Sequence, residues 1–343
     1  MNHFAVLVLD VFLRGSYRHS QEPIDINEHQ PDHQWLKESQ YMDAGIRKAL
    51  PTFQKVAHTR NFERHGVTVN FTFWDKTNNP RQAAFMLRLT EFMIEFLSRL
   101  KPIRRNLTLE LINYDGKKFL PKDGIFKSKH VNSGVTFFSP FDCDVYVYRK
   151  EEMAKVLIHE MIHFFDVDAK HVDHEVESEL HRHFCMSDRV DVVNVNESFT
   201  DTMACMVHTC LCAATSSPYD SISSYLKDVH LLIRQEHDFM RRQAHQVLKH
   251  VDYDPRCSSK NGEETHAIAY YVIKSLMFDH LDEFYRLMRP TNYVLTNVRV
   301  FTGFVTHIIG KVIDWSAYGK KEYKALTSKG KTMRMTTLNL KSI

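Results

Sequence analysis

The chain has 343 residues, of which 43% are hydrophobic and 12% are aromatic. It therefore has enough apolar residues to bury a sizeable core, which excludes an intrinsically disordered protein. The formal net charge is only +3, so charge does not support nucleic acid as a partner. No stretch approaches the roughly 20 apolar residues of a membrane span. The length predicts one large domain or two domains of ordinary size.

The cysteines and the N-terminal residues bear on the compartment. None of the six cysteines belongs to a C-x₂-C pair, and their number is low for a disulfide-stapled scaffold. Residues 4–12 form a short apolar run interrupted by Asp10, without the flanking features of a signal peptide. We expect this run to be a buried strand, with a signal peptide as the alternative. These features favour reduced cysteines and an intracellular protein, in the cytoplasm of its own cell or, for a viral protein or effector, of a host cell.

The first 150 residues show strand and helix patterns in turn. Residues 14–40 are polar and carry two prolines, so we expect a surface loop there, followed by a weakly helical stretch over 36–56. Further on, β-branched and aromatic residues in alternation predict strands, and apolar residues at helical spacing after Pro80 predict a helix. The expected order is a strand at 67–74, a helix at 80–100, and strands at 107–112, 134–138 and 144–148.

The last of these strands leads into residues 156–166, which read VLIHEMIHFFD and contain His159, Glu160 and His163 in the spacing H-E-x-x-H. Helical residues four apart share one face, so the two imidazoles are able to bind one tetrahedral Zn²⁺. Glu160 then reaches a water on the metal without being a ligand, as a zinc hydrolase requires. So short a motif also arises by chance in a chain with 21 histidines. The neighbouring residues are apolar, however, and burying these polar groups without a metal would be unfavourable.

A catalytic zinc needs a third protein ligand and keeps one position for water. Residues 196–201 read NESFTD, and Glu197 and Asp201 are again four residues apart on a predicted helix. Glu197 is the best third ligand, and Asp201 is placed to accept a hydrogen bond from a ligand histidine. The intervening residues 168–188 offer rival ligands, namely His171, His174, His181 and His183. We expect this segment to be a polar, solvated insert, with a second metal site as the alternative.

The two motifs together, H-E-x-x-H followed by N-E-x-x-T-D, resemble those of gluzincin metallopeptidases such as thermolysin-like and neprilysin-like enzymes. The resemblance covers roughly residues 130–215. The run from His163 to Asp166 also looks like the H-x-F-D of neprilysin-like enzymes, which implies Asp166 as a further acid that supports the site. The 34 positions from His163 to Glu197 are more than in thermolysin-like enzymes and fewer than in neprilysin-like ones. The resemblance implies a zincin-like fold, one zinc ion per chain and hydrolysis of peptide bonds.

The residues after 200 are predicted to be helical. We expect a long amphipathic helix over 221–251, a helical run from about Thr265, and two more apolar helical runs that extend to about Gly310. From Lys320 the chain is basic and poor in apolar residues. We therefore expect a mobile tail, which could bind an acidic partner through its charge.

Amide hydrolysis also needs a hydrogen-bond donor to the developing oxyanion besides the metal. In thermolysin-like enzymes this donor is a downstream histidine or tyrosine. By resemblance, His266, Tyr270 and Tyr271 are the candidates, because H-x-x-x-Y places a histidine and a tyrosine on one helical face. Aromatic packing in the core explains each of them equally well when it is taken alone.

The chain is therefore predicted to be an α+β protein of zincin-like architecture. A small mixed β-sheet and the active-site helix form the upper half, and an edge strand, 134–138 or the following one, is expected to pair with a substrate peptide. The lower half is expected to be all helical. The predicted divisions are an N-terminal region (1–66), an upper subdomain (67–190), a helical lower subdomain (191–319) and a basic tail (320–343).

The leading functional hypothesis is a zinc metallopeptidase that cleaves a peptide or protein substrate, with Glu160 as the general base. The alternative is an inactive structural or interaction protein in which zinc only staples the two halves together. A purely structural site has no use for Glu160, which favours the enzyme.

Overall fold

The computed structural model describes residues 1–15, 24–27, 42–122, 125–139, 141–168, 174–185, 194–216, 219–254, 265–320, 332–341 and 343. In these ranges the strands form one mixed six-stranded sheet in the order β1-β2-β3-β4-β6-β5. The strands are β1 (Asp25–Asn27), β2 (Val56–Arg64), β3 (Val67–Asp75), β4 (Arg105–Ile112), β5 (Gly134–Phe138) and β6 (Asp142–Val147). β3, β4 and β6 are parallel neighbours, and β1, β2 and β5 pair antiparallel with their neighbours.

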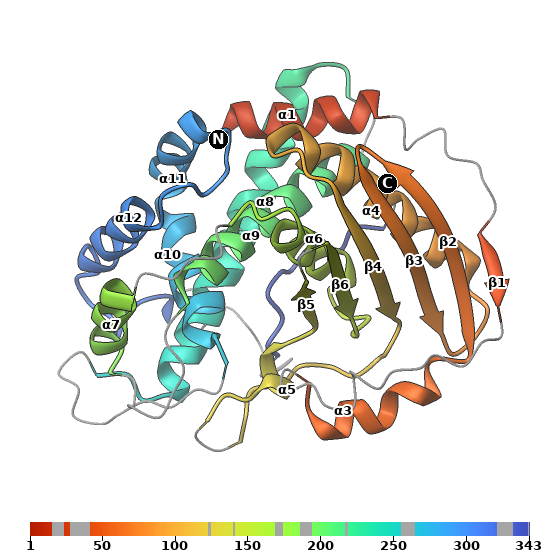
Figure 1. Cartoon of the computed structure of the whole chain (residues 1–343). Helices are drawn as coiled ribbons and strands as arrows, with labels where there is room; N and C mark the ends of the chain where they lie inside the picture. The colour runs from red at the N-terminus through yellow and green to blue at the C-terminus, as the bar shows by residue number, and fades with distance from the viewer. Residues whose placement is uncertain are drawn as a thin grey trace.

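The helices lie beside and behind this sheet. Figure 1 shows α10, α11 and α12 at the left of the molecule and α8 and α9 near its middle, with α6 between these two helices and the strands. The helices of the first half are α1 (Asn2–Arg14), α3 (Ala44–Ala49), η2 (Leu50–Thr52), α4 (Pro80–Leu100), α5 (Ser128–Val131), α6 (Met153–Phe164) and α7 (His174–His183). Those of the second half are α8 (Val195–Ser216), α9 (Ile222–His250), the π-helical η3 (Ile268–Ile273), α10 (Lys274–Asp279), α11 (Leu281–Met288), η4 (Arg289–Thr291) and α12 (Val298–Gly310).

This architecture agrees with the α+β prediction, and the zincin-like assignment stays a prediction. The expected strands at 67–74, 107–112, 134–138 and 144–148 and the helices at 80–100 and 221–251 are present with shifts of only a few residues. The described residues between 194 and 320 form helices and no strands, as expected. Most buried apolar side chains, from Phe4 to Leu340, belong to one large core, and a smaller second cluster includes Ile46, Trp74 and Tyr148. The predicted divisions at 66, 190 and 319 stay a prediction.

The N-terminal run is a helix, so the predicted buried strand is wrong. Residues 2–14 form α1, which packs one side against α4, α8 and α9 and buries Phe4, Ala5, Val8, Leu9, Val11 and Phe12. Apolar residues also occupy its outer side, where Leu13 is exposed. A short continuous apolar run of this kind does not distinguish a strand from a helix, because the helical period of the buried side is hidden. Among the described residues, no helix is both long and apolar enough to cross a membrane.

The polar strand β2 was not predicted. The weak helix expected over 36–56 is limited, in the described residues, to α3 and η2, and β2 begins at Val56. β2 joins β3 through His65 and Gly66, whose φ angles are 51° and 80°. Two left-handed residues form the tight turn that suits the twist of a hairpin, and glycine adopts this conformation without strain.

The cysteines differ in part from expectation. Cys205, Cys210 and Cys212 are buried thiols on α8, as expected for core residues, and Cys143 is a buried thiol outside any disulfide. Cys185, in contrast, is disulfide-bonded. The expectation that all cysteines are reduced is therefore not met in this structure.

The C-terminal segment 332–341 is packed into the core, so the predicted mobile tail is wrong for these residues. Met333 and Thr336 are almost completely buried. The carboxylate of Glu152 accepts from the amides of Met335 and Thr336 at 2.6 and 2.7 Å, and Glu236 accepts from the next two amides. Buried polar side chains thus satisfy the backbone of this segment, which composition alone does not reveal. The first tail residues, 321–331, lie outside the described residues.

Glu152 should be a major contributor to stability, because it also pairs with the buried ammonium of Lys118 at 2.8 Å. Replacing Glu152 by alanine would leave that charge and two buried amides without a partner. We expect Glu152→Ala to lower the free energy of unfolding by about 3–5 kcal/mol, measured by urea denaturation. As a control, Glu283→Ala removes an exposed ion pair with Lys311 and should leave the midpoint unchanged. Equal midpoints for the two variants would contradict this account.

Candidate functional site

The helix α6 supplies the two histidines of the H-E-x-x-H motif. All of its residues except His163 are buried, because it lies between the sheet and α8. His159 and His163 are one turn apart, and their Nε2 atoms approach to 3.0 Å. Both rings therefore point their Nε2 atoms to the same place, as the sequence predicted.

Glu197, from the first turn of α8, completes a group of three ligand atoms. Its Oε2 atom lies 3.3 Å from Nε2 of His159 and 3.5 Å from Nε2 of His163. Ligand atoms about 2.0–2.1 Å from a tetrahedral zinc ion lie about 3.3 Å from one another. The spacings of these three atoms therefore fit the edges of a zinc tetrahedron, with one vertex left for another ligand.

This group is the candidate metal site found among the described residues. His181 and His183 are not part of it, and the ring of His183 packs against Trp315 instead. His171 and the side chain of His174 lie outside the described residues. Part of the predicted polar insert forms α7, whose Leu180 is buried.

Each histidine uses its other nitrogen to contact a carboxylate. Nδ1 of His159 lies 3.1 Å from Oδ1 of Asp201, as expected. Nδ1 of His163 lies 2.5 Å from Oδ2 of Asp168, whose position is held by a hydrogen bond from the hydroxyl of Thr200 at 2.9 Å. These bonds orient both rings with Nε2 toward the ligand group.

The acid that supports His163 is Asp168, and the prediction of Asp166 is wrong. The helix ends at Phe164, and Asp166 has a left-handed φ of 52°. This turn directs the Asp166 carboxylate to Arg105, at 3.5 Å, and returns the chain so that Asp168 reaches His163. The spacing H-x-F-D pointed to the nearer acid, because a sequence pattern does not show where the helix stops.

Glu160 lies beside the metal group and faces β5. Its Oε2 atom accepts a hydrogen bond from the hydroxyl of Thr136 at 2.7 Å. Burial raises the pKa of Glu160 to about 7, against the opposing effects of His163 and Thr136. A carboxyl group with a pKa near neutrality can both accept and release a proton, which suits a general base.

The charges of the ligand group suit a cation. Burial lowers the pKa of His159 to about 3, so this ring is neutral. Burial also opposes a charge on His163, but Asp168 and Glu197 outweigh it and hold its pKa well above the usual value. Burial alone would raise the pKa of Glu197, yet His163 and hydrogen bonds from both histidines hold it well below its ordinary range. A positive charge is thus stabilised between these residues, and a metal ion would take the place of that proton.

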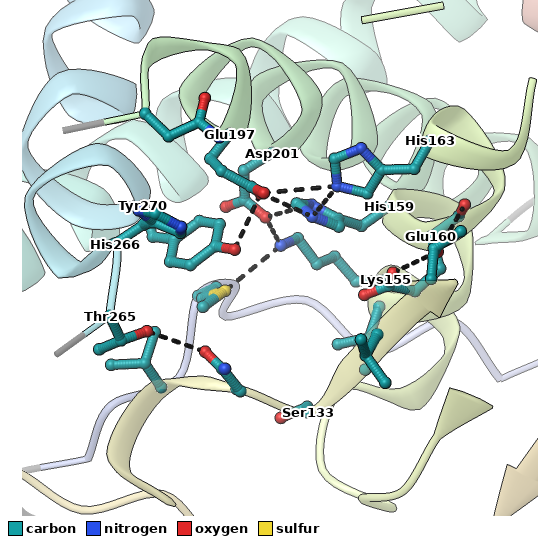
Figure 2. Close-up of a pocket in the computed structure, with 18 of the residues that line it drawn as sticks. Ser133, Lys155, His159, Glu160, His163, Glu197, Asp201, Thr265, His266 and Tyr270 are labelled. Carbon is teal, nitrogen blue, oxygen red and sulfur yellow. Dashed lines mark hydrogen bonds and ion pairs between the residues drawn. The ribbon is translucent and has the colours of Figure 1, made fainter. Parts of the chain in front are cut away.

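Two of the three candidate oxyanion donors lie at the site. The hydroxyl of Tyr270 donates to Oε2 of Glu197 at 2.8 Å, and His266 lines the same cavity (Figure 2). Tyr271 does not take part, because its hydroxyl donates to the carbonyl of Met333 at 2.5 Å. Successive helical residues point in different directions, so only one of the two neighbouring tyrosines can face the metal group.

A cavity of about 540 Å³ opens beside the metal group. Its walls come from β5, α6, the start of α8 and the residues before and within η3. β5 is at the end of the strand order, and it pairs with β6 through one edge only in the described sheet. The cavity therefore runs along the last strand of the described sheet.

Two buried lysines beneath the metal group were not predicted. Lys155 and Lys274 both form ion pairs with Asp201, the acid that contacts His159. Lys155 lies four residues before His159, and that spacing on an apolar helix is the only signal of it in the sequence. Lys274 comes from α10 and could not be associated with the site without the tertiary structure.

No family model, curated protein or solved structure matches this chain. The gluzincin assignment therefore stays a prediction that rests on the two motifs.

We expect Glu197→Ala to weaken zinc binding by more than about 100-fold, which exceeds the typical loss from an outer partner of a ligand. Zinc affinity can be measured by competition with a chromophoric chelator. His181→Ala is the matched control and should bind zinc like the unchanged protein. If Glu197→Ala kept its affinity and a histidine variant of the segment 168–188 lost it, Glu197 would not be the third ligand.

Proposed function

We propose that the protein is a zinc-dependent hydrolase of peptide bonds in which Glu160 acts as the general base. The observation that carries this proposal is the spacing of the three donor atoms of His159, His163 and Glu197, which matches a zinc tetrahedron with one open vertex. Glu160 faces the adjoining cavity and is not one of the three donors. Three ligands, an open position and a nearby carboxylate are the parts that metal-assisted hydrolysis needs.

The zinc ion would polarise the scissile carbonyl group and lower the pKa of a water molecule to about 7. Glu160 would take the proton from that water and pass it to the leaving amine. Thr136 holds one oxygen of Glu160 through its hydroxyl, which keeps the carboxylate on the side of β5. Tyr270 and His266 lie where a donor to the oxyanion is required.

An extended peptide is the substrate form that suits this cavity. β5 is the last strand of the described sheet, and an extended peptide can add to such an edge strand as another strand. Gly134 at the start of β5 lies against Glu160, since a Cβ atom there would be only 2.5 Å from Oε1 of Glu160. The absence of a side chain at this position leaves room for the base and for a substrate next to it.

The alternative is a structural or interaction protein in which the metal only joins the sheet half to the helical half. The ligands do come from two helices, α6 and α8. A structural zinc site, however, normally has four protein ligands and no open position. The described residues supply three, and a buried carboxylate faces the remaining space, so we favour the enzyme.

Glu160→Gln tests the proposed base. The amide keeps the size of the side chain but cannot accept the proton. We expect zinc content to stay at one ion per chain and hydrolysis to fall by about 10²–10⁴-fold. Zinc is measured by elemental analysis, and hydrolysis by mass spectrometry of new termini in a peptide mixture from a digested cell extract. Undiminished cleavage by Glu160→Gln would exclude Glu160 as the base. If the protein without any substitution contained no zinc, the metal mechanism would be excluded.

Gly134→Ala tests the position of the base without altering it chemically. The added methyl group would displace Glu160 and Val156, because atoms of both side chains lie within 2.9 Å of the place that its carbon would take. We expect turnover to fall tenfold or more, as is usual for a small displacement of a reacting group, and zinc affinity to stay unchanged. Gly303→Ala in α12 is the control, because nothing lies within 4 Å of its Cβ position. Full activity of Gly134→Ala would show that this contact does not position Glu160.

A further inference from the structure

The cavity has a polar floor that the proposed hydrolysis does not use. Beyond the metal group and Glu160, its lining includes Lys155, Ser133, Asn132 and Thr265. Figure 2 draws the ammonium group of Lys155 next to Asp201 near the centre of the view, with Ser133 below it and Thr265 at the lower left. We call this part of the cavity, defined by Lys155 and Ser133, the floor recess.

Lys155 brings a positive charge that is only partly compensated. Its side chain is 1% exposed, and its ammonium contacts Asp201 and, at 3.4 Å, the sulfur of Met335. Asp201 also binds the ammonium of Lys274 at 2.6 Å. In the described part of the chain, Asp201 is the carboxylate in contact with both lysines, so this trio carries a formal charge of +1. Burial lowers the pKa of Lys155 to about 7, with Lys274 in the same direction and Cys205 and Glu152 opposed to it, as burial of an ammonium group does.

Ser133 provides a second and independent sign of a missing ligand. It lies between α5 and β5, lines the cavity and is only 4% exposed. Its hydroxyl group has no hydrogen-bond partner among the described residues. A buried hydroxyl without a partner is unfavourable, and most such groups in proteins are satisfied. A ligand with an acceptor oxygen in the recess would satisfy it.

We propose that the floor recess binds a carboxylate group of the substrate, with Lys155 and Ser133 as its donors. This inference rests on the proposed peptidase function and names its substrate class, peptides with an acidic group next to the scissile bond. Lys155 is one helical turn before His159, about 6 Å along the axis of α6. A side chain of the residue at the scissile bond spans that distance. The carboxylate would neutralise the remaining positive charge of the two lysines and accept a hydrogen bond from the hydroxyl group of Ser133.

Two sources can supply this carboxylate, and the experiment distinguishes them. One is the side chain of an aspartate or glutamate within the peptide, and the other is the free C-terminus of the peptide. The substrates are therefore two pairs of synthetic peptides. In the first pair a central glutamate is exchanged for glutamine and both C-termini are amidated. In the second pair the central residue is leucine. Only one residue follows the scissile bond in these peptides, and its C-terminal carboxylate is either free or amidated.

Cleavage of these peptides is measured with the zinc-loaded full chain, and binding is measured by fluorescence anisotropy with the zinc-loaded Glu160→Gln variant. We expect the acidic member of at least one pair to be favoured by about tenfold or more in both measurements, the effect of one charge-assisted hydrogen bond. The preferred pair identifies the source of the carboxylate.

Three variants locate the recognition. Lys155→Met should reduce the preference to less than about twofold, and Ser133→Ala should reduce it by about threefold, because the uncharged hydroxyl group is the weaker of the two donors. Lys311→Met removes an exposed lysine of α12's end and should leave the preference unchanged. If Lys155→Met fails to fold or to hold zinc, Ser133→Ala decides, because Ser133 is not one of the three candidate ligands.

Zinc-dependent cleavage with equal rates and affinities within both pairs would overturn the floor recess and leave the proposed function intact. A preference that survives in both Lys155→Met and Ser133→Ala would also overturn it. A chain that holds no zinc and cleaves no peptide would overturn the proposed function, and the floor recess with it.

Discussion

The buried carboxylate of Asp201 is the interaction on which the rest of the site depends. It lies on α8 and contacts His159 and Lys155 of α6 and Lys274 of α10. Lys274 also donates to the carbonyl of Met335 in the C-terminal segment, at 3.1 Å. One carboxylate thus connects three helices and the last described part of the chain. Because isolated charges are strongly disfavoured in a protein interior, these elements can be buried only together.

This arrangement explains why the two ligand histidines have different surroundings. The acid behind His159 is shared with two ammonium groups, whereas the acid behind His163 is held by the hydroxyl of Thr200. A carboxylate that binds two cations is a weaker acceptor for a third donor. Asp168 therefore raises the basicity of His163 more than Asp201 raises that of His159. The main effect of Asp201 on His159 is to fix the orientation of its ring. The site combines one strongly supported donor with one that the buried ion network orients.

The parts of the fold that could be predicted are those with a local signal. The strands β3, β4, β5 and β6 alternate in polarity or are rich in β-branched residues, and α4 begins at Pro80, a residue suited to a first turn. The errors have specific causes. Apolar residues of α1 lie on its outer side as well as on its buried side, so its period was hidden. The segment 332–341 follows a basic stretch, and the buried acids and amides that hold it are far away in the sequence. Asp168 replaced Asp166 because the turn after α6 has a left-handed residue, which no pattern in the run HFFD indicates.

The sequence by itself determined the chemistry of the candidate metal group. The spacing of His159 and His163, and of Glu197 and Asp201, places these side chains one turn apart on any α-helix, because the period of the helix is a property of the backbone. Only the tertiary structure decided how the two helices meet, which of Tyr270 and Tyr271 faces the metal group, and that Lys274 and Met335 lie beneath it. These contacts join residues far apart along the chain, so they depend on how helices, sheet and C-terminal segment pack, and local periodicity contains no information about that packing.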